Sequence, residues 1–167
     1  MNMKVETLPK YRLAYVRQVG PYGPGNIQAM ETLKKWAEQS HLLTESAIIL
    51  GIPQDNPETT LPENCRYDAC IVISNEYQMD HSICESELSG GKYVIRKVKH
   101  SAEDIQKAWT DIFLDLQNSG YHIDHKPILE RYTGDMISSD YCEICVPVKL
   151  QQSGAIPHSC SSGKMML

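Results

Sequence analysis

The sequence of 167 residues predicts an α+β protein, built from two β-α-β-β halves whose antiparallel sheet is covered by two helices. Strand-like alternation of apolar and polar residues recurs along the chain, and two stretches carry apolar residues at helical spacing. Both patterns occur in the same order in each half, about residues 1–74 and 92–149. A half of this size covers one face of its sheet. We therefore expect the halves to pack together around a central ligand cleft.

The first half reads strand, helix, strand, strand. YRLAYVRQV (11–19) alternates as a half-buried strand does, and GPYGPGN then breaks the pattern. AIILGI (47–52) and RYDACIVI (66–73) are the next strands, separated by a proline-rich loop. Between 11–19 and 47–52 we expect an amphipathic helix with one apolar face, formed by Ile27, Met30, Leu33, Trp36 and Ala37.

The second half repeats this order. KYVIRKVK (92–99) is a strand, and Ser101 with Asp104 three residues later is typical of a helix N-cap. The helix that follows has its own apolar face, and Asn118, Ser119 and Gly120 are expected to end it. PILERY (127–132) and YCEICVPV (141–148) are the last strands. We expect residues 75–91 to form a connector and residues 150–167, rich in small polar residues, to form a flexible tail.

The composition of the chain indicates which kinds of partner and which cellular location to expect. The net charge of −5 argues against direct binding of nucleic acid, which favours a basic face. No apolar run reaches the roughly 18 residues of a membrane span, and the N-terminus has no signal-peptide core, so we expect a cytoplasmic protein with reduced cysteines. Cys142 and Cys145 form a C-x-x-C, but residues three apart on a strand point to opposite faces. We expect no metal and no cofactor.

Two glutamates occupy strand positions where aliphatic residues are usual. Glu130 shares its strand face with Tyr132, and Glu143 shares its face with Cys145. The opposite face of the last strand is apolar, which favours packing against a helix. Alternation alone leaves two readings open. The glutamates line the cleft, or they lie on a solvated face and pair with residues such as Lys92 or Arg131.

Four motifs connect the chain with a known family: the early VGPYG, ENCRYDACIVI, GGKYVIRKVK before a Trp-containing helix, and PILERY followed by YCEICVPVK. On these motifs the chain resembles the GyrI-like effector-binding family over about residues 1–149. The resemblance implies a tandem α+β repeat around a ligand cleft. The same domain forms the effector-binding part of AraC-type and MerR-type regulators, and it stands alone in the bacterial protein that inhibits DNA gyrase. The sequence before Tyr11 has no room for a helix-turn-helix, which favours the stand-alone form.

The resemblance also implies a site. In multidrug-regulator relatives two acidic residues thirteen apart line a pocket for lipophilic cations, and Glu130 and Glu143 match that spacing. Cys145 departs from the pattern, because relatives often have an aromatic residue there. The remaining candidates are aromatic side chains that could contact an organic cation, namely Tyr67, Tyr93, Tyr132 and Trp109. Trp109 also fits a plain core role, and Asp68 is a further acidic candidate near a loop.

The predicted function is binding of small organic, lipophilic cationic molecules in the cleft, with a regulatory or protective role. The first alternative is a protein–protein module that acts on DNA gyrase or another protein. The second alternative is a hydrolase of strained electrophilic small molecules, in which the cleft glutamates act as general acid or base.

Overall fold

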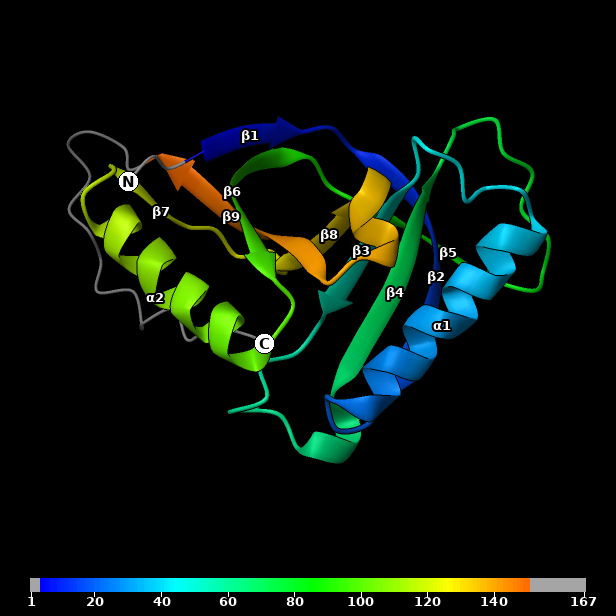
Figure 1. The fold of residues 1–167 in the computed structure, drawn as a ribbon, viewed down its shortest axis with the longest axis horizontal. Coiled ribbons are helices and arrows are strands. Elements are labelled where there is room, and N and C mark those ends of the chain that lie inside the picture. The colour runs from blue at the N-terminus through cyan, green and yellow to red at the C-terminus, as the bar shows by residue number, and fades with distance from the viewer. Residues whose placement is uncertain (1–3, 151–167) are drawn as a thin grey trace.

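The structure, a computed structural model, describes residues 4–150, which form one antiparallel sheet of nine strands with two α-helices (Figure 1). The α+β class and the repeated strand–helix–strand–strand order are both confirmed. Leu150, expected in the tail, ends the last strand, and the rest of the expected tail lies outside the described residues. In chain order the elements are β1 (Lys4–Leu8), β2 (Tyr11–Val19), α1 (Pro24–Gln39), β3 (Ile48–Pro53), the 3₁₀ turn η1 (Pro62–Asn64), β4 (Arg66–Ile73), β5 (Cys84–Leu88), β6 (Gly91–Lys99), α2 (Ala102–Gln117), β7 (Tyr121–Ile123), β8 (Leu129–Thr133), the 3₁₀ turn η2 (Gly134–Ser138) and β9 (Tyr141–Leu150).

The strand order of the sheet reflects the duplication. The order is β1-β6-β9-β8-β3-β4-β2-β5, with β7 beside β9. The strands β6, β9 and β8 of the second half therefore mirror β2, β4 and β3 of the first, and the halves meet where β3 pairs with β8. Gly51 of β3 lies directly opposite Glu130 of β8 at this junction.

The two halves exchange their edge strands. β1 runs into β2 along the chain but pairs with β6, and β5 runs into β6 but pairs with β2. The segment 75–91, expected as a connector, therefore contains a strand. The two connections pass in contact, because a Cβ added at Gly90 would lie 2.6 Å from the Leu8 carbonyl oxygen. This exchange ties each half to the other through the backbone.

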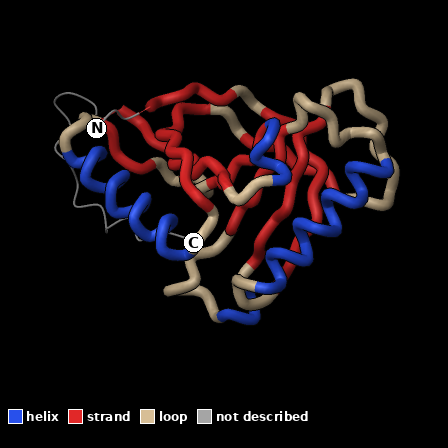
Figure 2. Tube along the Cα trace, in the orientation of Figure 1, coloured by secondary structure: helices blue, strands red, loops and turns tan. Residues whose placement is uncertain are grey.

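Each helix covers the outer strands of its own half. α1 packs on β2 and β4, and α2 packs on β6 and β7, so that the two helices flank the strands between them (Figure 2). The Ser101 hydroxyl accepts the backbone N–H of Asp104 at 3.2 Å, which confirms the predicted N-cap. Neither α1 nor α2 nor any other helix within residues 4–150 is long and apolar enough to cross a membrane.

The expected face of α1 needs one correction. Ile27 is 60% exposed, whereas the buried residues of this helix are Ala29, Leu33 and Ala37. At about 100° per residue, Ile27 lies roughly 120° around the helix from Leu33 and so outside the buried stripe. The helix was predicted correctly, but its face is centred on the alanines.

The sheet has a helix face and an inner face, each with its own core. On the helix face, α1 and α2 pack on separate apolar clusters. The inner face has no helix, yet its cluster is buried and draws side chains from every strand except β7. One cluster can gather all those strands because the sheet curls around it. The cluster comprises Leu8, Leu13, Leu50, Ile52, Cys70, Leu88, Tyr93, Ile95, Leu129 and Cys145.

Candidate functional site

The junction of the two halves places a carboxylate on the helix face. The helices pack on outer strands, and the central strands β3 and β8 run between α1 and α2 (Figure 1). Glu130 of β8 pairs with Ile144 of β9, whose side chain belongs to the α2 core. Because directly paired residues point to the same face, Glu130 points to the helix face. Its side chain keeps 16% exposure.

Each oxygen of the Glu130 carboxylate has one partner. The Tyr67 hydroxyl donates to Oε1 at 3.2 Å, and Nε2 of His100 lies 3.3 Å from Oε2. Both contacts are at the long end of the hydrogen-bond range. Within residues 4–150, Glu130 forms one ion pair. Its partner is His100, whose side chain is 47% exposed. The carboxylate is therefore mostly buried, and its two hydrogen-bond contacts are long.

Gly51 makes room for this arrangement. A Cβ at position 51 would lie 2.2 Å from the Tyr67 hydroxyl oxygen and 2.7 Å from Oε1 of Glu130. No side chain can occupy that space without moving Tyr67 or Glu130. A glycine inside a strand thus marks a close approach of other groups over the sheet.

Further aromatic side chains lie on the same face of the sheet as the carboxylate. Tyr132 packs against the cores under both α1 and α2, and its ring meets the His100 ring edge-on with centroids 6.2 Å apart. Trp109 of α2 is 3% exposed in the core that Tyr132 contacts. Its Nε1–H has no hydrogen-bond partner among the described residues. A buried donor of this kind is available to an acceptor on a bound molecule or to water.

The electrostatics at Glu130 favour neutral tyrosines and a protonated histidine. Burial, followed by the charge of Glu130, raises the pKa of Tyr67, and the same causes raise the pKa of Tyr132. Burial raises the pKa of the Cys142 thiol to about 12. The hydrogen bond to Glu130 raises the pKa of His100, against the opposing effect of burial. His100 is thus the group here that changes charge near neutral pH.

The structure does not bring Glu130 and Glu143 together. Glu143 pairs directly with Arg131, the residue after Glu130, so the two glutamates point to opposite faces of the sheet. The Arg131 guanidinium is 8% exposed and donates to Glu143 at 2.8 Å and to Glu6 of β1 at 2.8 and 3.2 Å. The expectation that both glutamates line one cleft is wrong, because the spacing of thirteen residues includes a change of strand.

The remaining predicted residues divide between the two faces. Tyr67, Tyr132 and Trp109 lie on the helix face with Glu130, whereas Tyr93 and Cys145 belong to the inner core. Burial raises the pKa of both Tyr93 and Cys145 to about 12. Cys142 packs under α2 and Cys145 in the inner core, which confirms that the C-x-x-C thiols diverge.

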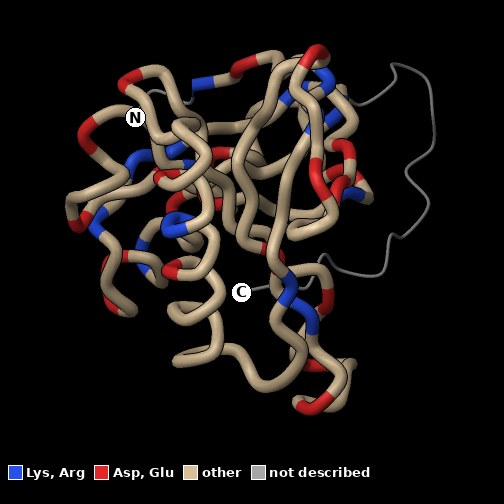
Figure 3. Tube along the Cα trace, turned by 90° about the vertical axis from the view of Figure 1, so that its right-hand side faces the viewer, with Lys and Arg blue, Asp and Glu red and all other residues tan. Residues whose placement is uncertain are grey.

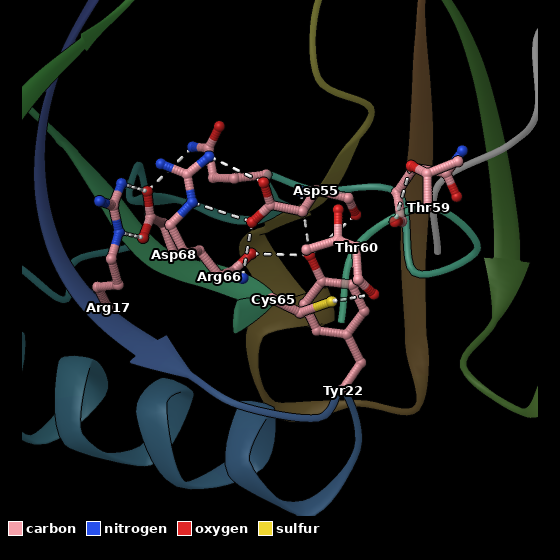
Figure 4. Close-up of polar contacts among 10 residues, drawn as sticks. Arg17, Tyr22, Asp55, Thr59, Thr60, Cys65, Arg66 and Asp68 are labelled. Carbon is pink, nitrogen blue, oxygen red and sulfur yellow. Dashed lines mark hydrogen bonds and ion pairs between the residues drawn. The ribbon is translucent and has the colours of Figure 1, made fainter. Parts of the chain in front are cut away.

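Asp68 occupies the position in the first half that Glu143 occupies in the second. It pairs with Arg17 of β2, as Glu143 pairs with Lys97 of β6. Asp68 is 3% exposed and accepts two bonds from Arg17, at 2.7 and 2.9 Å, and one from Gln54 at 3.0 Å (Figure 4). Its carboxylate is fully engaged on the inner face, away from Glu130.

A second group of polar residues fixes the loop beside Asp68. Arg66 donates to both oxygens of Asp55 at 2.9 Å, and the Tyr22 hydroxyl lies between the Asp55 backbone and the Arg66 carbonyl (Figure 4). These arginines are paired with carboxylates. Arg17 and Arg66 therefore have no free positive charge to bind an anionic ligand.

Other candidate chemistry finds little support in the described part of the chain. Within residues 4–150 no group of three or more His, Cys, Asp or Glu side chains could hold a metal ion. His122 lies in β7, and His125 is exposed. Acidic and basic positions are interspersed along the side of the molecule in Figure 3.

Two residues of the site were not expected from the sequence. Gly51 was treated as an ordinary strand residue, although a glycine inside a strand is itself a signal of close approach. His100 lies directly before the Ser101 N-cap, outside the strand and helix patterns that supplied the other candidates. Its proximity to Glu130 follows from the pairing of β6, β9 and β8, which short-range patterns do not contain.

The described residues form a curled α+β sheet that carries a carboxylate and aromatic side chains between two helices. The chain belongs to the GyrI-like family, since the model of the GyrI-like small molecule binding domain matches residues 1–149. The SPbeta prophage-derived protein YosT of Bacillus subtilis strain 168, named as a candidate transcriptional regulator, is 38% identical over 89% of this chain and 100% of its own. The DNA gyrase inhibitor of Cronobacter turicensis is 25% identical over 92% of this chain and 99% of its own.

Solved structures share the fold at low identity. The C-terminal domain of EcmrR matches with a TM-score of 0.66 at 13% identity, covering 89% of this chain and 98% of that domain. SAV2435 bound to tetraphenylphosphonium matches with a TM-score of 0.55 at 17% identity, covering 89% of this chain and 94% of its own. These likenesses confirm the predicted fold.

Proposed function

We propose that this protein binds small organic cations at Glu130, between α1 and α2, as a cytoplasmic effector-binding protein with a regulatory or protective role. The observation that carries the proposal is the Glu130 carboxylate itself. It is 16% exposed, and its two long contacts come from a neutral tyrosine and a histidine. A mostly buried carboxylate that is held by two long contacts is costly, and a cationic ligand relieves that cost.

The surroundings of Glu130 suit a large, weakly hydrated cation. Tyr132 packs against both helix cores beside His100, and aromatic rings attract cations when water is excluded. Such a ligand needs little dehydration, so burial of its apolar surface contributes to affinity. The central cleft that would receive it stays a prediction.

Proteins similar to this chain support the proposal. SAV2435, which shares the fold, has been solved with tetraphenylphosphonium, a permanent lipophilic cation. YosT carries the name of a candidate transcriptional regulator. We infer that this chain uses the shared fold for the same class of ligand.

Isothermal titration with tetraphenylphosphonium at pH 8.5 tests the proposal. Glu130→Gln keeps the size of the side chain and removes its charge, so we expect a loss of about 1.5–3 kcal/mol, or on the order of 10- to 100-fold in Kd. Glu143→Gln is the matched control, because this glutamate lies on the other face and its change should leave the Kd within about threefold. Binding that is equally tight in Glu130→Gln and wild type would refute the proposal.

A second candidate function is inhibition of DNA gyrase, favoured by the names of relatives near 25% identity. A supercoiling assay with purified gyrase and the full chain tests it directly. Inhibition at micromolar protein would support this role, and unchanged supercoiling would rule it out. The hydrolase alternative stays a prediction.

A further inference from the structure

We propose that His100 is a built-in counter-ion of Glu130 that a cationic ligand displaces, so that the site takes its ligand in competition with a proton. This inference rests on the proposed function and adds its regulation. When protonated, the imidazole neutralises the negative charge that Glu130 would otherwise offer to a cation.

The geometry places His100 where a ligand cation would compete with it. Nε2 lies 3.3 Å from Oε2 of Glu130, while Tyr67 occupies the other oxygen. The His100 side chain is 47% exposed, whereas that of Glu130 is 16% exposed, so His100 lies on the solvent side of the carboxylate. Its ring also meets Tyr132 edge-on, against an aromatic surface that a lipophilic cation would use.

His100 can leave this position without unfolding its neighbours. It follows the last residue of β6 and precedes the Ser101 cap of α2, and both elements are anchored by their own bonds. Its backbone N–H donates to the Asp140 carbonyl, which holds the main chain independently of the ring. Displacement of the ring therefore requires a side-chain movement only.

The two tyrosines and the thiol beside Glu130 and His100 keep their protons near neutral pH. The tyrosines Tyr67 and Tyr132 have raised pKa values and stay neutral, and the Cys142 thiol has a pKa of about 12. Asp140 adds negative charge that favours protonated His100. Arg131 lies on the other face and is paired with Glu6 and Glu143. The titratable or charged side chains that contact His100 or Glu130, or neighbour them, include Glu130 and Tyr132 on β8, Tyr67 on β4, Asp140 before β9, Cys142 on β9, Lys99 on β6, and Asp104 on α2, which bonds to Ser101.

Competition between a ligand cation and protonated His100 fixes the direction in which affinity changes with pH. Glu130 raises the pKa of His100, so the ion pair is complete below that pKa and is lost as the pH rises through it. A permanent cation therefore binds more tightly as the pH rises, by up to about tenfold per pH unit, and its affinity levels off once His100 is neutral. By the same linkage, binding of the cation releases a proton and lowers the pKa of His100.

Titration calorimetry of the full chain with tetraphenylphosphonium from pH 5.5 to 8.5 tests the inference. This probe carries a charge that does not titrate. We expect the wild-type Kd to fall with rising pH and then level off, while His100→Gln shows a flat profile near the wild-type plateau. His125→Gln, which changes an exposed histidine, should keep the wild-type profile. A flat wild-type profile, or a pH dependence that survives in His100→Gln, overturns the inference.

A second measurement does not depend on the variant folding. The His100 ring resonances of the wild-type protein are titrated by NMR with and without saturating tetraphenylphosphonium. We expect the pKa of His100 to fall when the cation is bound, and an unchanged pKa overturns the displacement. Failure of the probe to bind at pH 8.5 would refute the proposed function and this inference together, whereas pH-independent binding would refute this inference alone.

Discussion

Replacing Arg131 by methionine should destabilise the protein strongly, because it leaves a buried carboxylate without its partner. Arg131 is 8% exposed, and the Glu143 side chain that it holds is 12% exposed. Removal of one member of a buried ion pair costs about 3–5 kcal/mol. Glu6, at 33% exposure, can turn to water, so most of this cost comes from Glu143. For a chain of this length the expected fall in Tm is about 10 °C.

Urea unfolding followed by circular dichroism measures this loss. The double variant Arg131→Met with Glu143→Met should recover most of the stability, because it removes the stranded charge and keeps apolar volume in the inner core. The matched single variant Lys97→Met changes the cation opposite Glu143 on β6 and should cost less than about 1 kcal/mol. A free energy of unfolding that is equal in Arg131→Met and wild type would show that Glu143 is not held as described.

Three further outcomes follow from single contacts. Gly51→Ala should cost about 1–3 kcal/mol in urea unfolding and weaken tetraphenylphosphonium binding, because its Cβ would lie 2.2 Å from the Tyr67 hydroxyl oxygen; unchanged values of both would count against the packing over Glu130. Ser101→Ala should cost about 1 kcal/mol by loss of the α2 cap, and Ser101→Asp should restore it. The pKa of Glu6 is lowered from 4.5, mainly by its bond to Arg131, so its contribution is present above that value and is lost as the pH falls through the lowered pKa. Glu6→Gln should therefore flatten the acid limb of stability against pH, and an identical limb would contradict the ion pair.

Much of the fold could be predicted because its signals are local. Alternation located β2, β4, β6 and β9 to within about two residues, and the Ser101 cap located the start of α2. The edge strands were missed for a physical reason. CESEL in β5 has little apolar alternation, since an edge strand with charged residues resists unwanted pairing. The exchange of β1 and β5 between halves depends on long-range pairing that no local pattern encodes.

In the site, too, features with local signals could be predicted, and features that depend on strand pairing could not. Alternation correctly set Cys142 apart from Cys145 and placed the apolar face of β9 under a helix. It could not relate Glu130 to Glu143, because their relative faces depend on the register between two strands. That register pairs Glu143 with Arg131 instead. The partners of Glu130 come from β4 and from the end of β6, which only the assembled sheet brings together.

The central claim is that one carboxylate, Glu130, receives an organic cation between α1 and α2. A crystal structure of the protein with tetraphenylphosphonium tests it most directly. We predict density for the ligand on the helix face, with its phosphorus within about 6 Å of the Glu130 carboxylate and the His100 ring turned away. Ligand density on the inner face beside Glu143, or a bound ligand remote from Glu130, would contradict the account.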